Sequence, residues 1–234
     1  MEHGAARQGN ELIHSFLGLR KAVGFIGMGL PFVLLLVHGS GLDSVSQGYY
    51  TRGSALFVAG VCAIGIFLLF YRGYDRRDRI ASFSAGAAAL VVGQVPCGFG
   101  QEAGSAFLWG WGSAYAASVW PKVHLLAAAV LFCVLALFCL WLFPKSDAPP
   151  HANRKKNQRN LIYYVCGGVI ATCLLALFVH FAFVEWLGPS GVFWLETAML
   201  LAFGFSWAVK GEAVTFLNDG SAAAPTLGAS RRTA

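Results

Sequence analysis

Long apolar runs separated by short polar segments dominate the chain. The runs cover residues 22–38, 54–71, 80–96, 123–143, 161–184 and 192–209. Each is close to the roughly 20 residues that a helix needs to cross a hydrocarbon core about 30 Å thick. Apolar residues are continuous in these runs and do not alternate with polar ones, as barrel strands would require. The pattern therefore predicts an all-α integral membrane protein, a bundle of six transmembrane helices.

Composition supports this class. Hydrophobic residues make up 57% of the 234 residues and charged residues only 12%, whereas soluble domains carry about 25% charged residues. The six cysteines form no CxxC pair, so neither a disulfide framework nor a structural zinc site is expected. The net charge of +6 is carried between the apolar runs. With no basic soluble domain, no nucleic-acid partner is expected.

The basic residues also predict an orientation. All but two of the 17 Lys and Arg residues fall in the N-terminal segment, the second and fourth loops and the C-terminal segment; the exceptions are Arg52 and Lys122. By the positive-inside rule, both termini are then cytoplasmic. The predicted organisation is a cytoplasmic N-terminal segment (1–20), a six-helix transmembrane domain (21–212) and a disordered cytoplasmic tail (213–234).

Small residues mark where helices are expected to meet, because close backbone approach drives association in lipid. The candidates are Ala59 and Ala63, Ser82 and Gly86, and Gly167 with Gly168.

Ionisable residues in or beside a span are costly in lipid, so each is a functional hypothesis. On the predicted topology they gather at the outer ends of the runs. We predict a periplasm-facing polar pocket for a lipid or small amphiphile, and Asp43 or Glu196 as an ion-pair partner for Arg52. The pocket would be lined by Tyr49, Tyr50, Arg52, His124, His180 and Glu196.

Other interpretations of these residues stay open. His38, His124 and His180 could hold zinc, with Glu196 or Asp43 as general base, in a metal-dependent intramembrane hydrolase. Two histidines at matched depth could instead ligate haem iron, a less favoured interpretation. The histidines could also be hydrogen-bonded at span ends in a structural or assembly protein without a ligand. A non-enzymatic protein is favoured over an enzyme, and self-association into a homo-oligomer stays open.

The third loop, residues 98–121, carries Trp109, Trp111, Tyr115 and Trp120. Trp and Tyr favour the headgroup level of a bilayer. The loop is predicted to be either an aromatic belt or a lid over an outward-facing cavity.

Several short motifs carry a family resemblance. They are Ser46–Arg52 (SQGYYTR), Phe67–Asp75 (FLLFYRGYD), Arg159–Tyr163 (RNLIY), Phe193–Glu196 (FWLE) and Phe203–Glu212 (FGFSWAVKGE). With them the chain resembles uncharacterised bacterial six-span membrane proteins of the DUF998 group and, more distantly, the Frag1/DRAM/Sfk1 family. The resemblance implies a six-helix bundle in a bacterial inner membrane and brings no established activity. The association of distant eukaryotic members with lipid handling favours membrane lipids as partners. The alkaline ceramidase and adiponectin-receptor superfamily fits less well, because its paired His motif has no counterpart in the sixth run.

Overall fold

The computed structural model describes residues 2–39, 41–73, 75–98, 114–145 and 154–218. In these residues the chain is all-α. Its elements are α1 (Glu2–His38), η1 (Val45–Tyr50), α2 (Ser54–Phe70), α3 (Arg76–Gln94), α4 (Ala114–Leu137), η2 (Phe138–Leu142), α5 (Arg154–Ala182), α6 (Gly191–Lys210) and η3 (Thr215–Leu217). The turns η1 and η3 are 3-10 helices, and η2 is a π-helical turn that continues α4. Each predicted apolar run lies mainly within one of the six α-helices.

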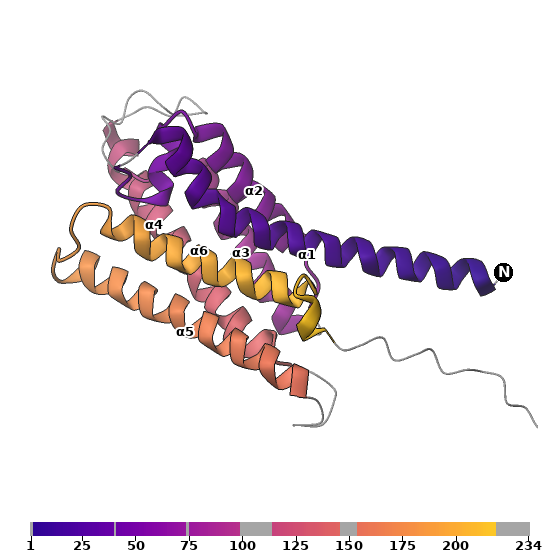
Figure 1. The fold of residues 1–234 in the computed structure, drawn as a ribbon. Coiled ribbons are helices and arrows are strands. Elements are labelled where there is room, and N and C mark those ends of the chain that lie inside the picture. Colours follow the sequence, from indigo (N-terminus) through magenta and orange to yellow (C-terminus); the bar gives the residue numbers. More distant parts are fainter. Residues whose placement is uncertain (1, 40, 74, 99–113, 146–153, 219–234) are drawn as a thin grey trace, which may run out of the picture.

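The six α-helices form a closed up-and-down bundle. Every helix packs against its neighbour in sequence, and α6 closes the ring against α1. Figure 1 shows α5 and α6 side by side, with α1 continuing beyond the bundle toward the N-terminus. Because successive helices alternate in direction, the bundle has two distinct ends. We call them the η1 end, which holds η1 and the α5–α6 connection, and the basic end, which holds Arg20, Lys145, Arg159 and Lys210.

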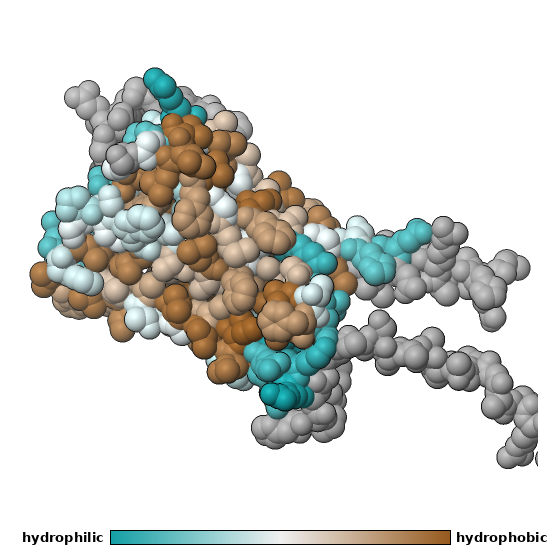
Figure 2. All heavy atoms as spheres, in the orientation of Figure 1, coloured by the Kyte–Doolittle hydropathy of each residue, from teal (hydrophilic) through white to brown (hydrophobic). Residues whose placement is uncertain are grey.

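Among the described residues, four helical segments are long and apolar enough to cross a membrane: His14–His38, Val119–Leu142, Arg154–Ala182 and Gly191–Lys210. The apolar helix α2 is shorter, with 17 residues. Large hydrophobic side chains face outward on several helices, including Leu36, Leu126 and Phe178. Figure 2 shows hydrophobic atoms across the middle of one face and the most hydrophilic atoms toward its ends. This is the surface expected of a helical membrane protein.

Glycines bring three pairs of helices into close contact. A Cβ on Gly204 would lie 2.4 Å from the carbonyl oxygen of Gly24. The backbones of α6 and α1 are therefore in direct contact at these two glycines. A Cβ on Gly86 would lie 2.7 Å from the Leu69 nitrogen, at the seam between α2 and α3. Gly167 packs directly on Leu140, next to α4. Gly86 and Gly167 thus lie at helix contacts as expected, whereas Gly168 faces open space and Ala59 and Ala63 are exposed.

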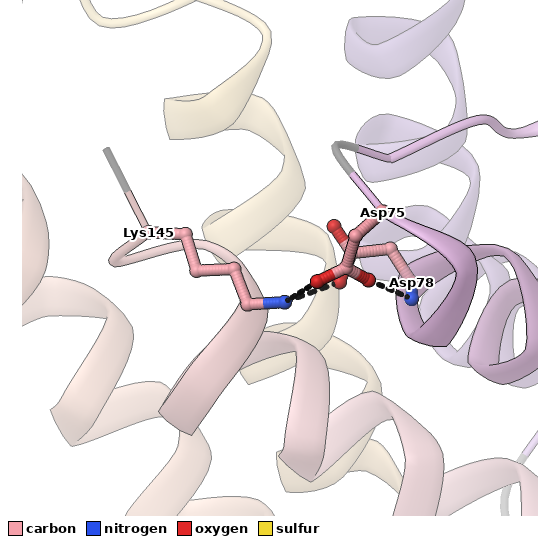
Figure 3. Close-up of polar contacts among 3 residues, drawn as sticks. All are labelled: Asp75, Asp78 and Lys145. Carbon is pink, nitrogen blue, oxygen red and sulfur yellow. Dashed lines mark hydrogen bonds and ion pairs between the residues drawn. The ribbon is translucent and has the colours of Figure 1, made fainter. Parts of the chain in front are cut away.

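An ion-pair cluster joins the start of α3 to the end of α4 (Figure 3). Asp75 is the N-cap of α3 and accepts the backbone N–H of Asp78 at 2.9 Å. Lys145 Nζ lies 3.0 Å from the Asp75 carboxylate and 2.6 Å from that of Asp78. Because these hydrogen bonds favour the charged forms, the pKa of Asp75 is lowered to about 2 and the pKa of Lys145 is raised.

The described part of the predicted tail is folded against α5. Leu217 is buried in η3, and its carbonyl accepts a hydrogen bond from the Arg159 guanidinium at 2.6 Å. Lys155 Nζ donates to the carbonyl of Asn218 at 2.6 Å. The packed chain therefore continues to Asn218, beyond the predicted start of the tail at residue 213.

Candidate functional site

Glu196 is an acidic residue of the bundle at the η1 end, and it lines two cavities there. It lies on α6 and is partly buried. Its Oε2 accepts hydrogen bonds from the Ser44 hydroxyl and the Val45 backbone N–H, both at 2.7 Å. Ser44 is also the N-cap of η1 and accepts the Ser46 N–H. The carboxylate therefore fixes η1 against α6, while its second oxygen, Oε1, accepts no hydrogen bond from the described residues.

A long groove opens beside Glu196, between α4 and α5. It has a volume of about 660 Å³ and an almost entirely apolar lining. From the contact at Gly167, the groove continues toward the η1 end along small side chains of α4 and α5, among them Ala128, Ala129 and Ala171. Glu196 is the single ionisable side chain in the lining, apart from the thiol of Cys133.

A second, much smaller cavity lies inside the ring of helices. Its volume is about 40 Å³, and it shares Glu196, Ala128 and Phe132 with the groove. Such a space is large enough for a water molecule, since a water needs about 10–15 Å³ of cavity volume. Glu196 thus lines both the groove between α4 and α5 and the cavity inside the bundle.

The two buried histidines bind backbone groups near their own helices. His124 Nδ1 lies 2.7 Å from the Val95 carbonyl oxygen, so this nitrogen carries the proton and donates. His180 Nδ1 accepts the backbone N–H groups of Trp186 and Leu187, at 3.2 and 3.3 Å. The first contact fixes the segment that follows α3, and the second fixes the connection between α5 and α6. Neither histidine lines the groove.

The other predicted site residues are distributed around η1. The rings of Tyr49 and Tyr50 pack edge to face at 5.2 Å, and the Tyr50 hydroxyl accepts the Gly98 N–H. Burial raises the pKa of Tyr50 to about 12. Arg52 is exposed and, among the described side chains, forms no ion pair with Asp43 or Glu196.

Asp43 instead binds the start of α6. Its carbonyl accepts the Phe193 N–H at 2.9 Å, and its carboxylate accepts the Ser190 N–H. Of the six residues predicted to line one polar pocket, only Glu196 lines the groove; the remaining five lie elsewhere at this end. The groove at this end is apolar with one carboxylate. Sequence reasoning missed it because small residues on two helices create it.

The structure does not group the residues of the metal hypothesis. His38 is exposed at the last turn of α1, whereas His124 and His180 are buried. Within the residues that the structure describes, no three His, Cys, Asp or Glu side chains are placed so that they could hold a metal ion. His38, His124 and His180 therefore do not form a shared ligand set.

No protein-family model, curated protein or solved structure matches this chain. The resemblance to bacterial six-span families stays a prediction. The aromatic loop expected to form a belt or lid falls largely on residues 99–113, outside the described part of the chain.

Proposed function

We propose that this chain is a six-span inner-membrane protein that binds an amphiphile in the groove between α4 and α5. The single observation that carries the proposal is Glu196, which lines an otherwise apolar groove of about 660 Å³ and whose Oε1 accepts no hydrogen bond from the described residues. Ligand sites commonly measure about 300–1,000 Å³ and combine apolar walls with a few polar groups. The groove has both properties.

The chemistry of the groove defines the occupant. Its apolar walls suit a hydrocarbon chain, and a carboxylate oxygen is a hydrogen-bond acceptor with negative charge. We therefore assign a lipid whose head carries a donor, such as a hydroxyl, amide or ammonium group. A head that is only an acceptor or an anion would meet the carboxylate unfavourably.

The proposed membrane orientation places the basic end in the cytoplasm and Glu196 near the periplasmic side. The distribution of Lys and Arg supports it, as does the alternating direction of the six α-helices. A membrane-impermeant thiol reagent tests it in intact cells. Cysteine at Arg52 should be labelled from outside, whereas cysteine at Arg77 should be labelled only after permeabilisation. The reverse pattern would refute the orientation.

Filling the groove tests the binding proposal. Ala171→Phe places an aromatic ring in the groove from an exposed position on α5, and Val165→Phe adds the same ring to an exposed face of α5 outside the groove. Native mass spectrometry of protein extracted in mild detergent should show a bound lipid in wild type and Val165→Phe, and at least five-fold lower occupancy in Ala171→Phe. Equal occupancy in the two variants would exclude the groove as the binding site.

A further inference from the structure

A third cavity lies at the basic end, far along the bundle from the groove. Its volume is about 250 Å³ and its lining is mostly polar. Five cationic side chains from four separate parts of the chain contribute to it: Arg20, Lys145, Lys156, Arg159 and Lys210. Among the described residues of the lining, Glu212 is the one acid and is exposed. Lys145 is already paired with Asp75 and Asp78, so the other four cations carry the charge of the pocket.

Aromatic rings and backbone carbonyls hold two of these cations in place. Lys210 Nζ donates to the Phe143 carbonyl at 3.1 Å and lies 5.6 Å from the centre of the Phe143 ring. The Arg20 guanidinium lies 4.5 Å over the Phe16 ring and donates to the Lys210 carbonyl at 3.4 Å. Cation–π contacts of this kind orient a charge without neutralising it.

Arg20 also retains an unused donor. Its Nε is buried and finds no acceptor among the described residues, although its terminal nitrogens bind Lys210 O and the Tyr71 hydroxyl. Buried N–H groups are rarely left without an acceptor, so this one calls for a partner. The Arg20 side chain also lines the pocket, so an anion bound there would lie next to this guanidinium group.

Convergence of like charges in one hollow needs a physical reason. The positive-inside rule requires basic residues on the cytoplasmic side and does not require them to share a cavity. Grouped cations repel one another, and a concave wall of low dielectric strengthens their field and attracts an anion. Guanidinium groups such as those of Arg20 and Arg159 match the geometry of phosphate oxygens.

We propose that this pocket binds a phosphate group. The volume equals several times the roughly 30 Å³ that a water occupies in the liquid, which leaves room for a tetrahedral oxyanion with part of an ester. The phosphate could belong to an anionic lipid headgroup or to free phosphate, and both present the same oxyanion to the pocket. This inference does not depend on the amphiphile groove.

Isothermal titration calorimetry of the full chain in uncharged detergent tests whether the pocket binds phosphate. Three probes are used: dihexanoyl phosphatidic acid, inorganic phosphate and, as the zwitterionic comparison, dihexanoyl phosphatidylcholine. We expect binding of an anionic probe that weakens as salt rises. Binding of phosphatidic acid alone identifies a lipid headgroup, and similar binding of inorganic phosphate identifies a free anion. Binding of neither anionic probe, or equal binding of phosphatidylcholine, would overturn the proposal.

Charge-matched variants separate the pocket from general surface charge. The double variant Lys156→Gln/Arg159→Gln removes two charges from the lining, and Arg77→Gln/Arg154→Gln removes two exposed charges outside it. The first should weaken anion binding at least ten-fold and the second less than two-fold. Equal losses would overturn the proposal. Because Arg159 also binds Leu217, Lys156→Gln alone serves as a second variant, with size-exclusion profiles and thermal unfolding as checks on the fold.

Discussion

The two ends of the bundle stabilise charged groups in different ways. At the η1 end, one carboxylate is held by neutral donors, the Ser44 hydroxyl and the Val45 N–H. At the basic end, cations pack on aromatic rings and one lysine is shared by two aspartates. The donors to Glu196 bring no opposite charge, whereas Lys145 pairs with two carboxylates of opposite charge. The difference suggests a site selective for a donor group at one end and an anion site at the other.

The largest effect is expected where one substitution disturbs both ends. Gly204→Val would place a branched side chain against the Gly24 carbonyl, separating α6 from α1. Overpacking of this kind destabilises by about 1–3 kcal/mol or more. We expect a large fall in the thermal unfolding temperature together with loss of lipid and phosphate binding. Gly168→Val is the matched control, because nothing lies within 4 Å of its Cβ position. Similar unfolding temperatures in the two variants would contradict the packing described here.

A smaller effect should be confined to the η1 end. Glu196→Leu leaves the Ser44 hydroxyl and the Val45 N–H without their acceptor, and an unpaired buried donor costs about 1–3 kcal/mol. Thermal unfolding should show that loss, and native mass spectrometry should show reduced lipid selectivity. Phosphate affinity at the other end should stay within two-fold of wild type. A parallel loss of phosphate affinity would show that the two ends are coupled.

The histidine contact to α3 should contribute less. His124→Leu keeps the side-chain volume similar and removes the hydrogen bond to the Val95 carbonyl. The net contribution of one such hydrogen bond to the free energy of unfolding is about 1 kcal/mol. We expect a small fall in unfolding temperature with no change in bound metal, measured by elemental analysis of the purified protein. Loss of stoichiometric metal in this variant would revive the zinc hypothesis.

The smallest effect concerns pH at the basic end. Since the pKa of Asp75 is lowered in the folded state, its ionisation stabilises the fold above its usual pKa, and this contribution disappears as the pH falls from about 4 to about 2. The raised pKa of Lys145 acts oppositely: its contribution is present below its usual pKa and is lost as the pH rises through the higher folded-state value. Asp75→Asn keeps an N-cap residue but cannot titrate. Between pH 4 and pH 2 the unfolding temperature should fall less in Asp75→Asn than in wild type; an equal fall would contradict the assignment.

The sequence predicted the helices well because the apolar runs record their positions directly. The sequence was a poor guide to the start of a helix when that start lies among charged residues. Helix α3 begins at Arg76, four residues before the apolar run, because Asp75 caps it. Glu196 could be singled out from sequence, since an acid inside an apolar run is rare. Its partners Ser44 and Val45 could not be predicted from the sequence. They reach Glu196 only because the segment between α1 and α2 folds back against α6.

The groove between α4 and α5 and the pocket at the basic end could not be predicted from the sequence, for a related reason. The groove exists because Ala128, Ala129 and Ala171 come together from two helices, and alanine also occurs in each of the other apolar runs. Arg20, Lys156 and Lys210 could be counted as cytoplasmic charges, but their convergence depends on the order of the helices around the ring. Linear spacing carries no information about either arrangement.

The π-helical turn Phe138–Leu142 sets the rotational phase of the end of α4. Phe143 N–H bonds to the Phe138 carbonyl at 2.8 Å, five residues back instead of four. A π turn of this kind accommodates one residue more than a regular helix does. A chain one residue shorter here would wind regularly, and every later side chain would rotate by about 100°. Lys145 would then face away from Asp78. The register of a single turn therefore determines whether this ion pair links α3 to the end of α4.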